Sequence, residues 1–286
     1  MNIPPGAAGR RRPPGVTSLV CALLWCGAAA IVWSAPQQGA VVRQQPEEKL
    51  FSTGPQARFR AFLYSPNIAE TGRPHETPVI FYSGEWGWRP LQQDLASYLA
   101  SKGRYVLGID SADYFARLVP AASLAADLGN FRAFVNERAG RPEGADVTLI
   151  GFAFGAEIIP YLLNETRAPG VRGAVLIAPD TKGTRVYRVA IQLKMDSPPE
   201  ERFDVGQELK QMAPLPVVLM EGTLDKDSAA KALADSPRGP HKYVAVEGGD
   251  RQFHEVRDAF FAVLLDALHW IDGTTVVPQG TPQAVP

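Results

Sequence analysis

The stretch DVTLIGFAFGAEIIPYLL, residues 146–163, decides the fold of this 286-residue chain. Its first five residues are mostly β-branched or aliphatic and predict a buried strand over 146–150. Gly151 and Gly155 bracket a short turn, and the apolar spacing after them predicts a helix over 156–163. A strand, a glycine-bracketed turn and a helix in this order are typical of a layered α/β domain.

The turn Gly151-Phe152-Ala153-Phe154-Gly155 has the context of the nucleophile elbow of α/β hydrolases, where serine is the middle residue. The glycines are needed because the turn is sharp and the helix packs close to the strand. Ala153 offers neither a lone pair nor a proton at the middle position. The motif therefore predicts a hydrolase scaffold that lacks its attacking atom.

Strand and helix signals alternate on both sides of this motif. The alternation predicts an α/β-hydrolase-like fold with a mainly parallel sheet and helices on both faces. Ligands of such sheets bind at the carboxyl ends of the strands. We expect strands at 59–64, 78–82, 105–109, 173–177, 217–220 and 243–246, an extended segment at 184–195, and helices at 91–102, 121–138 and 256–271.

The N-terminus carries an export signal. Arg10, Arg11 and Arg12 precede an uncharged apolar run from Val16 to Trp33. This pattern predicts an N-terminal hydrophobic helix, either a cleaved signal peptide or a signal anchor, with the domain on the far side of the membrane. We expect a basic N-terminus with the signal over 1–34, a linker over 35–57, the α/β domain over 58–272 and a disordered tail over 273–286.

Composition narrows the possible partners. The formal net charge is −1 and no basic stripe is visible, so we expect no nucleic acid partner. Both cysteines, Cys21 and Cys26, lie in the apolar run, which leaves the domain without a thiol. The histidines show no metal-ligand spacing, and we expect neither a metal nor a cofactor.

The acid of a hydrolase triad follows a late strand. Here the apolar run 217–220 leads to Asp225 and Asp227, and both stand at the right place. Asp227 could instead cap a helix that starts near Ser228, a role that needs only a carboxylate.

The histidine of a triad follows the last strand, and Gln252 stands there in this chain. Glutamine cannot take up a proton near neutral pH, so general-base chemistry is lost. His254 lies two residues further on and is the alternative base, with Asp250 and Asp110 as further acid–base candidates.

An oxyanion hole can persist without the serine and the histidine of a triad, because its donors are backbone N–H groups. The N–H of Phe154 and one from the loop Ser83–Trp88 would supply it. Glu85, Trp86 and Trp88 in this loop are candidate binding residues. The alternative is a glycine turn with two core tryptophans.

Five motifs in order resemble the VirJ/AcvB family of bacterial virulence proteins. The elbow 151–157 is similar to a Gly-Tyr-Ser-Phe-Gly-Ala-Asp/Glu sequence, and Asp227-Ser228 matches the acid position. The loop 84–88 resembles Gly-Asp-Gly-Gly-Trp, 110–115 resembles Asp-Ser-x-x-Tyr-Phe, and 249–253 resembles Gly-Asp-His-His-Phe. The resemblance covers about residues 77–270.

The resemblance implies an exported bacterial α/β hydrolase, linked to hydrolysis of lysyl-phosphatidylglycerol and to virulence. It places the nucleophile at Ala153, the acid at Asp227, the oxyanion donor at Phe154 and the histidine at Arg251 or Gln252. It also implies a location in the periplasm or on the outer face of the inner membrane.

Three hypotheses follow. The first is a catalytically impaired relative that binds a phospholipid headgroup or an envelope protein in the old cleft. The second is an active hydrolase that uses Glu85, Asp110, Asp250 or His254 on a bound water. The third is a structural subunit that keeps only the fold.

Overall fold

The computed structural model describes residues 42–53, 57–67, 76–167, 169–187, 195 and 197–275. The expected signal segment and nearly all of the expected tail lie outside these residues. By its contacts the chain divides into Met1–Gln37 and Gln38–Pro286, and the fold below is that of the second unit. No helix within the described residues is long and apolar enough to cross a membrane.

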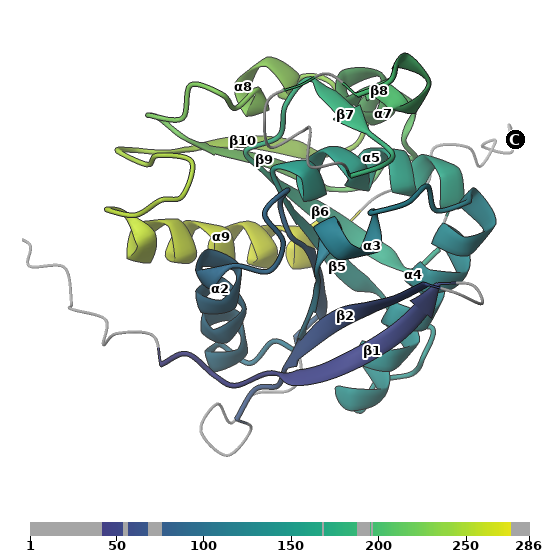
Figure 1. Ribbon diagram of the computed structural model, residues 1–286. Helices are drawn as coiled ribbons and strands as arrows, with labels where there is room; N and C mark the ends of the chain where they lie inside the picture. The colour runs from purple at the N-terminus through teal and green to yellow at the C-terminus, as the bar shows by residue number, and fades with distance from the viewer. Residues whose placement is uncertain are drawn as a thin grey trace, which may run out of the picture. The chain divides into compact units, whose positions relative to one another are not determined.

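An eight-stranded sheet forms the centre of the domain (Figure 1). The neighbouring strands β4, β3, β5, β6, β9 and β10 run parallel, while β1 and β2 are antiparallel to their neighbours. The expected α/β-hydrolase-like architecture is confirmed. In spatial order the strands are β1 (Glu47–Thr53), β2 (Ala57–Tyr64), β4 (Val106–Ile109), β3 (Val79–Tyr82), β5 (Val147–Phe152), β6 (Val171–Ile177), β9 (Val217–Gly222) and β10 (His241–Val246).

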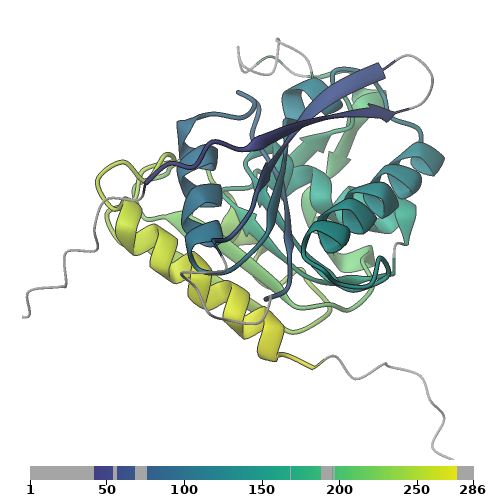
Figure 2. The ribbon, with the colours of Figure 1, turned by 90° about the horizontal axis from the view of Figure 1, so that it is seen from below.

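Helices cover both faces of the sheet, as the view in Figure 2 shows. On one face α2 (Pro90–Ser101) and α9 (Arg257–Gly273) pack against the sheet in one apolar cluster. On the other face α4 (Ala121–Arg138) and α5 (Phe154–Thr166) pack in a second cluster. The shorter helices α3 (Ser111–Tyr114), α7 (Val205–Gln211) and α8 (Ala230–Leu233) follow β4, β8 and β9 along the chain.

Strand β1 occupies residues that the sequence assigned to the linker. It pairs antiparallel with β2, and Phe51 packs its ring against Phe59 and Phe131 at centroid distances of 5.9 and 5.0 Å. An edge strand buries few side chains, here chiefly the ring of Phe51, so its sequence contains few apolar residues from which a strand could be predicted. The linker expected over 35–57 therefore ends earlier than its sequence suggested.

A second, two-stranded sheet lies beside α5. Its strands β7 (Lys182–Thr184) and β8 (Arg202–Asp204) pair antiparallel, with the 3₁₀ helix η1 (Pro199–Glu201) just before β8. Phe203 stacks on Tyr161 of α5 at 5.1 Å. The extended segment expected over 184–195 thus belongs to β7 only at its first residue, and 188–194 lie outside the described residues.

A buried arginine ties the end of α9 to the start of β3. The Arg104 side chain is 0% exposed, and its Nη2 donates to Asp272 Oδ2 at 2.6 Å. Its Nε lies 2.8 Å from Glu76 Oε2 without the alignment of a hydrogen bond, and Nη1 donates to the Thr77 carbonyl at 3.0 Å. The two carboxylates compensate a charge that would otherwise be buried alone.

We predict that Arg104→Ala lowers the free energy of unfolding by about 3 kcal/mol, because it leaves two carboxylates without their shared cation. Urea denaturation checks this. The control is Arg138→Ala, which breaks the exposed pair with Glu47 and should cost less than about 1 kcal/mol. Equal losses in the two variants would contradict a special role for Arg104.

Candidate functional site

The elbow motif has the backbone geometry that its glycines predict. Ala153 stands at φ 48° and ψ −116° between β5 and α5, and its N–H donates to the Ile177 carbonyl at 2.8 Å. A Cβ on Gly151 would collide with the Gly155 backbone, and a Cβ on Gly155 would collide with the Tyr82 carbonyl. A positive φ at a non-glycine residue costs about 1–3 kcal/mol and persists only where the surroundings enforce it.

The middle position of the elbow is closed off. Ala153 is fully buried, and its Cβ would lie 3.5 Å from a Cβ built on Gly84. In an active elbow the serine oxygen stands exposed above the sheet. Ala153 therefore presents neither a nucleophile nor an open surface.

The carboxylate of Asp110 holds the loop that follows β3. Asp110 accepts hydrogen bonds from the N–H groups of Trp88 at 3.3 Å and Asp113 at 3.2 Å. Gly87 has φ 75°, and a Cβ there would lie 2.9 Å from the Asp110 carboxylate. Asp110 is thus a positioning residue for the loop rather than the acid–base group that we considered.

The two loop tryptophans have different roles. Trp88 lies in the core, where its Nε1 donates to the Tyr64 hydroxyl at 3.1 Å and its ring packs on Phe62 and Phe81. Its assignment as a binding residue is therefore corrected, because the glycine-turn alternative holds for it. Trp86 is exposed and lines a cavity together with Glu85.

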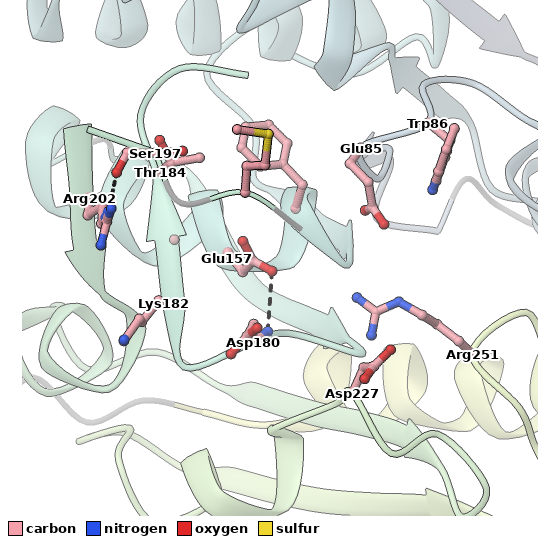
Figure 3. A pocket seen from close by; sticks show the side chains of 13 residues that line it. Glu85, Trp86, Glu157, Asp180, Lys182, Thr184, Ser197, Arg202, Asp227 and Arg251 are labelled. Atoms are coloured by element: carbon pink, nitrogen blue, oxygen red, sulfur yellow. Dashed lines mark hydrogen bonds between the residues drawn. The ribbon is translucent and has the colours of Figure 1, made fainter. Parts of the chain in front are cut away.

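The main cavity, about 590 Å³, opens beside the elbow at the carboxyl ends of the strands. That volume falls within the range of small-molecule sites. Charged groups of both signs line it, and Figure 3 shows how they are arranged. The lining residues are Glu85, Trp86, Phe154, Glu157, Asp180, Lys182, Gly183, Thr184, Met195, Ser197, Arg202, Asp227 and Arg251.

Phe154, the expected oxyanion residue, faces this cavity from the first position of α5. The first N–H groups of a helix have no acceptor within the helix, so this N–H is available to a ligand in principle. Its ring packs edge-on against Phe115 and Tyr187 at 5.7 and 5.9 Å. These contacts fix one wall of the cavity.

Glu157 is the central carboxyl of the cavity and was not singled out from the sequence. Its Oε1 accepts a hydrogen bond from the Asp180 N–H at 3.3 Å (Figure 3). Burial raises the pKa of Glu157 to about 8, and the nearby carboxylates of Asp180 and Glu85 add to the shift, while Arg251 opposes it. Glu157 is therefore largely protonated at neutral pH.

Arg251 stands at one of the two expected histidine positions and changes the role of the acid position. Its Nη1 lies 3.4 Å from Asp225 Oδ2, and its guanidinium extends into the cavity beside Asp227 (Figure 3). Asp225 also accepts the Asp227 N–H at 3.0 Å. The acid region thus faces a fixed cation where a hydrolase would have an imidazole.

Asp227 lines the cavity, as the acid position requires. Helix α8 starts later than the sequence suggested, and the N–H of Ala230 donates to Ser228 Oγ at 3.2 Å. The N-cap residue of this helix is Ala229, which makes no side-chain cap, so Asp227 is not the N-cap residue.

Gln252 and His254 do not reach the main cavity. Gln252 lines a separate cavity of about 290 Å³ with Gly84, Glu85, Trp86 and Phe152 among its walls. His254 is exposed, and its Nδ1 lies 3.0 Å from Asp250 Oδ2, a contact that lowers the pKa of Asp250. Between them Phe253 is buried and stacks on Phe260 at 3.9 Å.

The sequence-predicted residues therefore separate into two groups. Glu85, Trp86, Phe154 and Asp227 meet around one cavity, whereas Ala153, Gln252, Asp250 and His254 are not among its lining residues. Sequence reasoning missed Glu157, Asp180, Lys182 and Arg202 as lining residues. The available signal was the position of Glu157 one turn into the elbow helix.

Comparisons with known proteins agree with this architecture. A family model described as "Bacterial virulence protein (VirJ)" matches residues 76–271. No curated protein sequence matches the chain. Similar solved structures include Est1E from Butyrivibrio proteoclasticus, with a TM-score of 0.57 and 11% identity over 79% of this chain and 99% of that one.

Two further structures show the same likeness. The esterase domain of a Rhodothermus marinus protein has a TM-score of 0.57 and 15% identity over 80% of this chain and 99% of that one. A dienelactone hydrolase from Anabaena variabilis has a TM-score of 0.54 and 17% identity over 79% and 99%. At these identities the likeness establishes the fold alone.

We predict that Glu157→Gln stabilises the protein increasingly as the pH rises from about 5 to about 8. The unfolded glutamate ionises near 4.5 and the folded one only near 8, so unfolding of the wild type releases a proton in this range. Thermal unfolding at pH 5, 7 and 9 measures the difference. The control is Glu165→Gln, an exposed position on the same helix. A pH-independent difference for Glu157→Gln would contradict the shifted pKa.

Proposed function

Because the chain belongs to the VirJ family of bacterial virulence proteins, we propose that it is a family member that binds a phospholipid headgroup without cleaving it. The observation that carries this proposal is the closed elbow, where a buried Ala153 replaces the attacking residue. Loss of the nucleophile or of its base in a triad costs on the order of 10⁶-fold in kcat. Both positions are changed here.

The cavity supports binding because it is open and polar. Arg251, Lys182 and Arg202 contribute positive charge, and a planar guanidinium recognises phosphate through paired hydrogen bonds. Asp180 and Asp227 give the same cavity an acidic side, and Glu157 adds a carboxyl group that is largely protonated at neutral pH. A headgroup that carries a phosphate together with hydroxyl or amino groups matches such a lining. A purely structural role does not require an open cavity with such a lining, so the cavity favours a binding function over a structural one.

The proposed location of the protein rests on its N-terminal sequence. Arg10, Arg11 and Arg12 before the apolar run of 16–33 favour export, with the domain in the periplasm or on the outer face of the inner membrane. At this location the headgroups of the outer leaflet are within reach of the domain.

We predict that neither the wild type nor Ala153→Ser releases headgroup or fatty acid from phosphatidylglycerol or lysyl-phosphatidylglycerol in a mass-spectrometric assay. Ala153→Ser restores an oxygen but no base, because Gln252 lines a different cavity and His254 binds Asp250. The double variant Ala153→Ser with Gln252→His serves as the comparison, with weak turnover as its upper limit. Strong activity of the single variant would reveal a base elsewhere and overturn the assignment.

We predict that Arg251→Gln weakens binding of glycerophosphoglycerol, the deacylated headgroup, by about tenfold or more, because hydrogen bonds to charged groups contribute about 1.5–3 kcal/mol. Isothermal titration of the full chain measures the dissociation constant. Arg238→Gln, an exposed position outside the cavity lining, should leave it unchanged. Equal affinities in all three proteins would exclude Arg251 as the phosphate contact.

An active hydrolase remains the second candidate, and one observation favours it. Glu157 keeps a proton near neutral pH inside the cavity, which is the state required of a general acid, and Asp180 offers a carboxylate beside it. If the wild type cleaves either lipid and Glu157→Gln abolishes the activity, this second function is the correct one. Activity that survives Glu157→Gln would exclude Glu157 as the acid.

A further inference from the structure

Large apolar side chains are exposed mainly at one edge of the domain. Six such side chains are more than half exposed in the described part of the chain. Val42 stands where that part begins, and Leu50 lies on the edge strand β1. The other four, which we call the apolar rim, are Trp86 (51%), Leu118 (55%), Met195 (60%) and Leu224 (63%).

The topology of the sheet brings the rim to the carboxyl edge. Trp86 follows β3, Leu118 follows β4 and α3, and Leu224 follows β9, three parallel strands whose carboxyl ends meet at one edge. Trp86 and Met195 also line the main cavity. The rim therefore lies at the same edge of the sheet as the cavity, and two of its four members line that cavity.

Basic side chains accompany the rim. Exposed Arg117 and Lys226 lie one and two residues from Leu118 and Leu224. The Nε of Arg89 donates to the Trp86 carbonyl at 2.7 Å, which keeps this exposed guanidinium beside the tryptophan. Acidic groups stand at the same edge as well. Asp225 pairs with Arg251, Asp250 pairs with His254, and Glu85, Asp180 and Asp227 line the cavity, while Asp113, Glu247 and Glu255 are exposed.

The described chain begins close to this edge. Asp94, in the second turn of α2, binds both Arg43 at 2.6 Å and Arg257, the first residue of α9, at 2.9 Å. In the sequence the apolar run ends at Trp33, nine residues before Val42. Nine residues of extended chain span at most about 30 Å, so a bilayer that holds this run lies within that reach of residue 42.

We propose that the apolar rim docks on the surface of an anionic phospholipid bilayer, with the mouth of the cavity against the headgroups. Exposed tryptophan and aliphatic side chains insert about 5–10 Å into the boundary between headgroups and acyl chains. Lysine and arginine side chains near an anionic surface add electrostatic attraction to this insertion. Docking rests on the proposed membrane location, but it does not depend on whether the bound lipid is cleaved.

Spin-label depth measurement tests this docking on the full chain in nanodiscs of phosphatidylcholine and phosphatidylglycerol. The background carries Cys21→Ser and Cys26→Ser, because these are the two native thiols. One nitroxide is attached at Leu224→Cys. The matched control is attached at Glu143→Cys, an exposed position in the turn before β5, at the opposite ends of the strands.

The expected result is that the label at position 224 collides more often with oxygen than with a water-soluble nickel chelate, and that the label at 143 shows the reverse. Adding Trp86→Ser and Met195→Ser, or using phosphatidylcholine alone, should return the label at 224 toward water. Water-like exposure at both positions would overturn the docking proposal and leave the rim as a surface for a protein partner. This outcome is independent of the headgroup binding and release assays, so failure of docking is distinguishable from failure of the proposed function.

Discussion

The close approach of α5 to the sheet is the constraint on which the site depends. Gly151 and Gly155 permit it, because a side chain at either position would collide with the backbone of the neighbouring segment. The approach forces Ala153 into a positive φ and directs the first turn of α5 toward the carboxyl edge. Phe154 and Glu157 consequently line the main cavity. Backbone packing thus fixes the architecture of the site whichever side chain stands at position 153.

The chemistry of the cavity differs from that of a hydrolase because its charges have been rearranged. A triad passes a proton from nucleophile to histidine, and the acid orients the imidazole. Here the acid region faces the permanent cation of Arg251, which cannot accept a proton at physiological pH. Glu157 instead keeps its proton near neutral pH, because burial raises its pKa. These features suit a site that recognises charge and do not suit one that relays protons from an attacking oxygen.

The sequence predicted the strands of the large sheet from β2 to β10 and the helices α2, α4, α5 and α9, with Ala121–Arg138 to the residue, because alternating apolar periods and glycine turns are local signals. It predicted no element at α3, β8 or α7. It did not predict β1, because this strand lies at the edge of the sheet and few of its side chains are apolar. The carboxyl of Glu157 was missed because its raised pKa depends on burial in the fold and on the charges of Asp180 and Glu85, which come from other segments. The separation of Gln252 from the main cavity likewise depends on how the last turn folds, since Phe253 is buried against Phe260.

Native mass spectrometry of the full chain with intact phosphatidylglycerol tests the central claim most directly. The account predicts a one-to-one complex in which the mass of the lipid stays unchanged over hours. A loss of headgroup or acyl mass from the bound lipid, or a covalent acyl adduct on the protein, would contradict it. Either result would show that residues other than Ala153 carry out the hydrolysis.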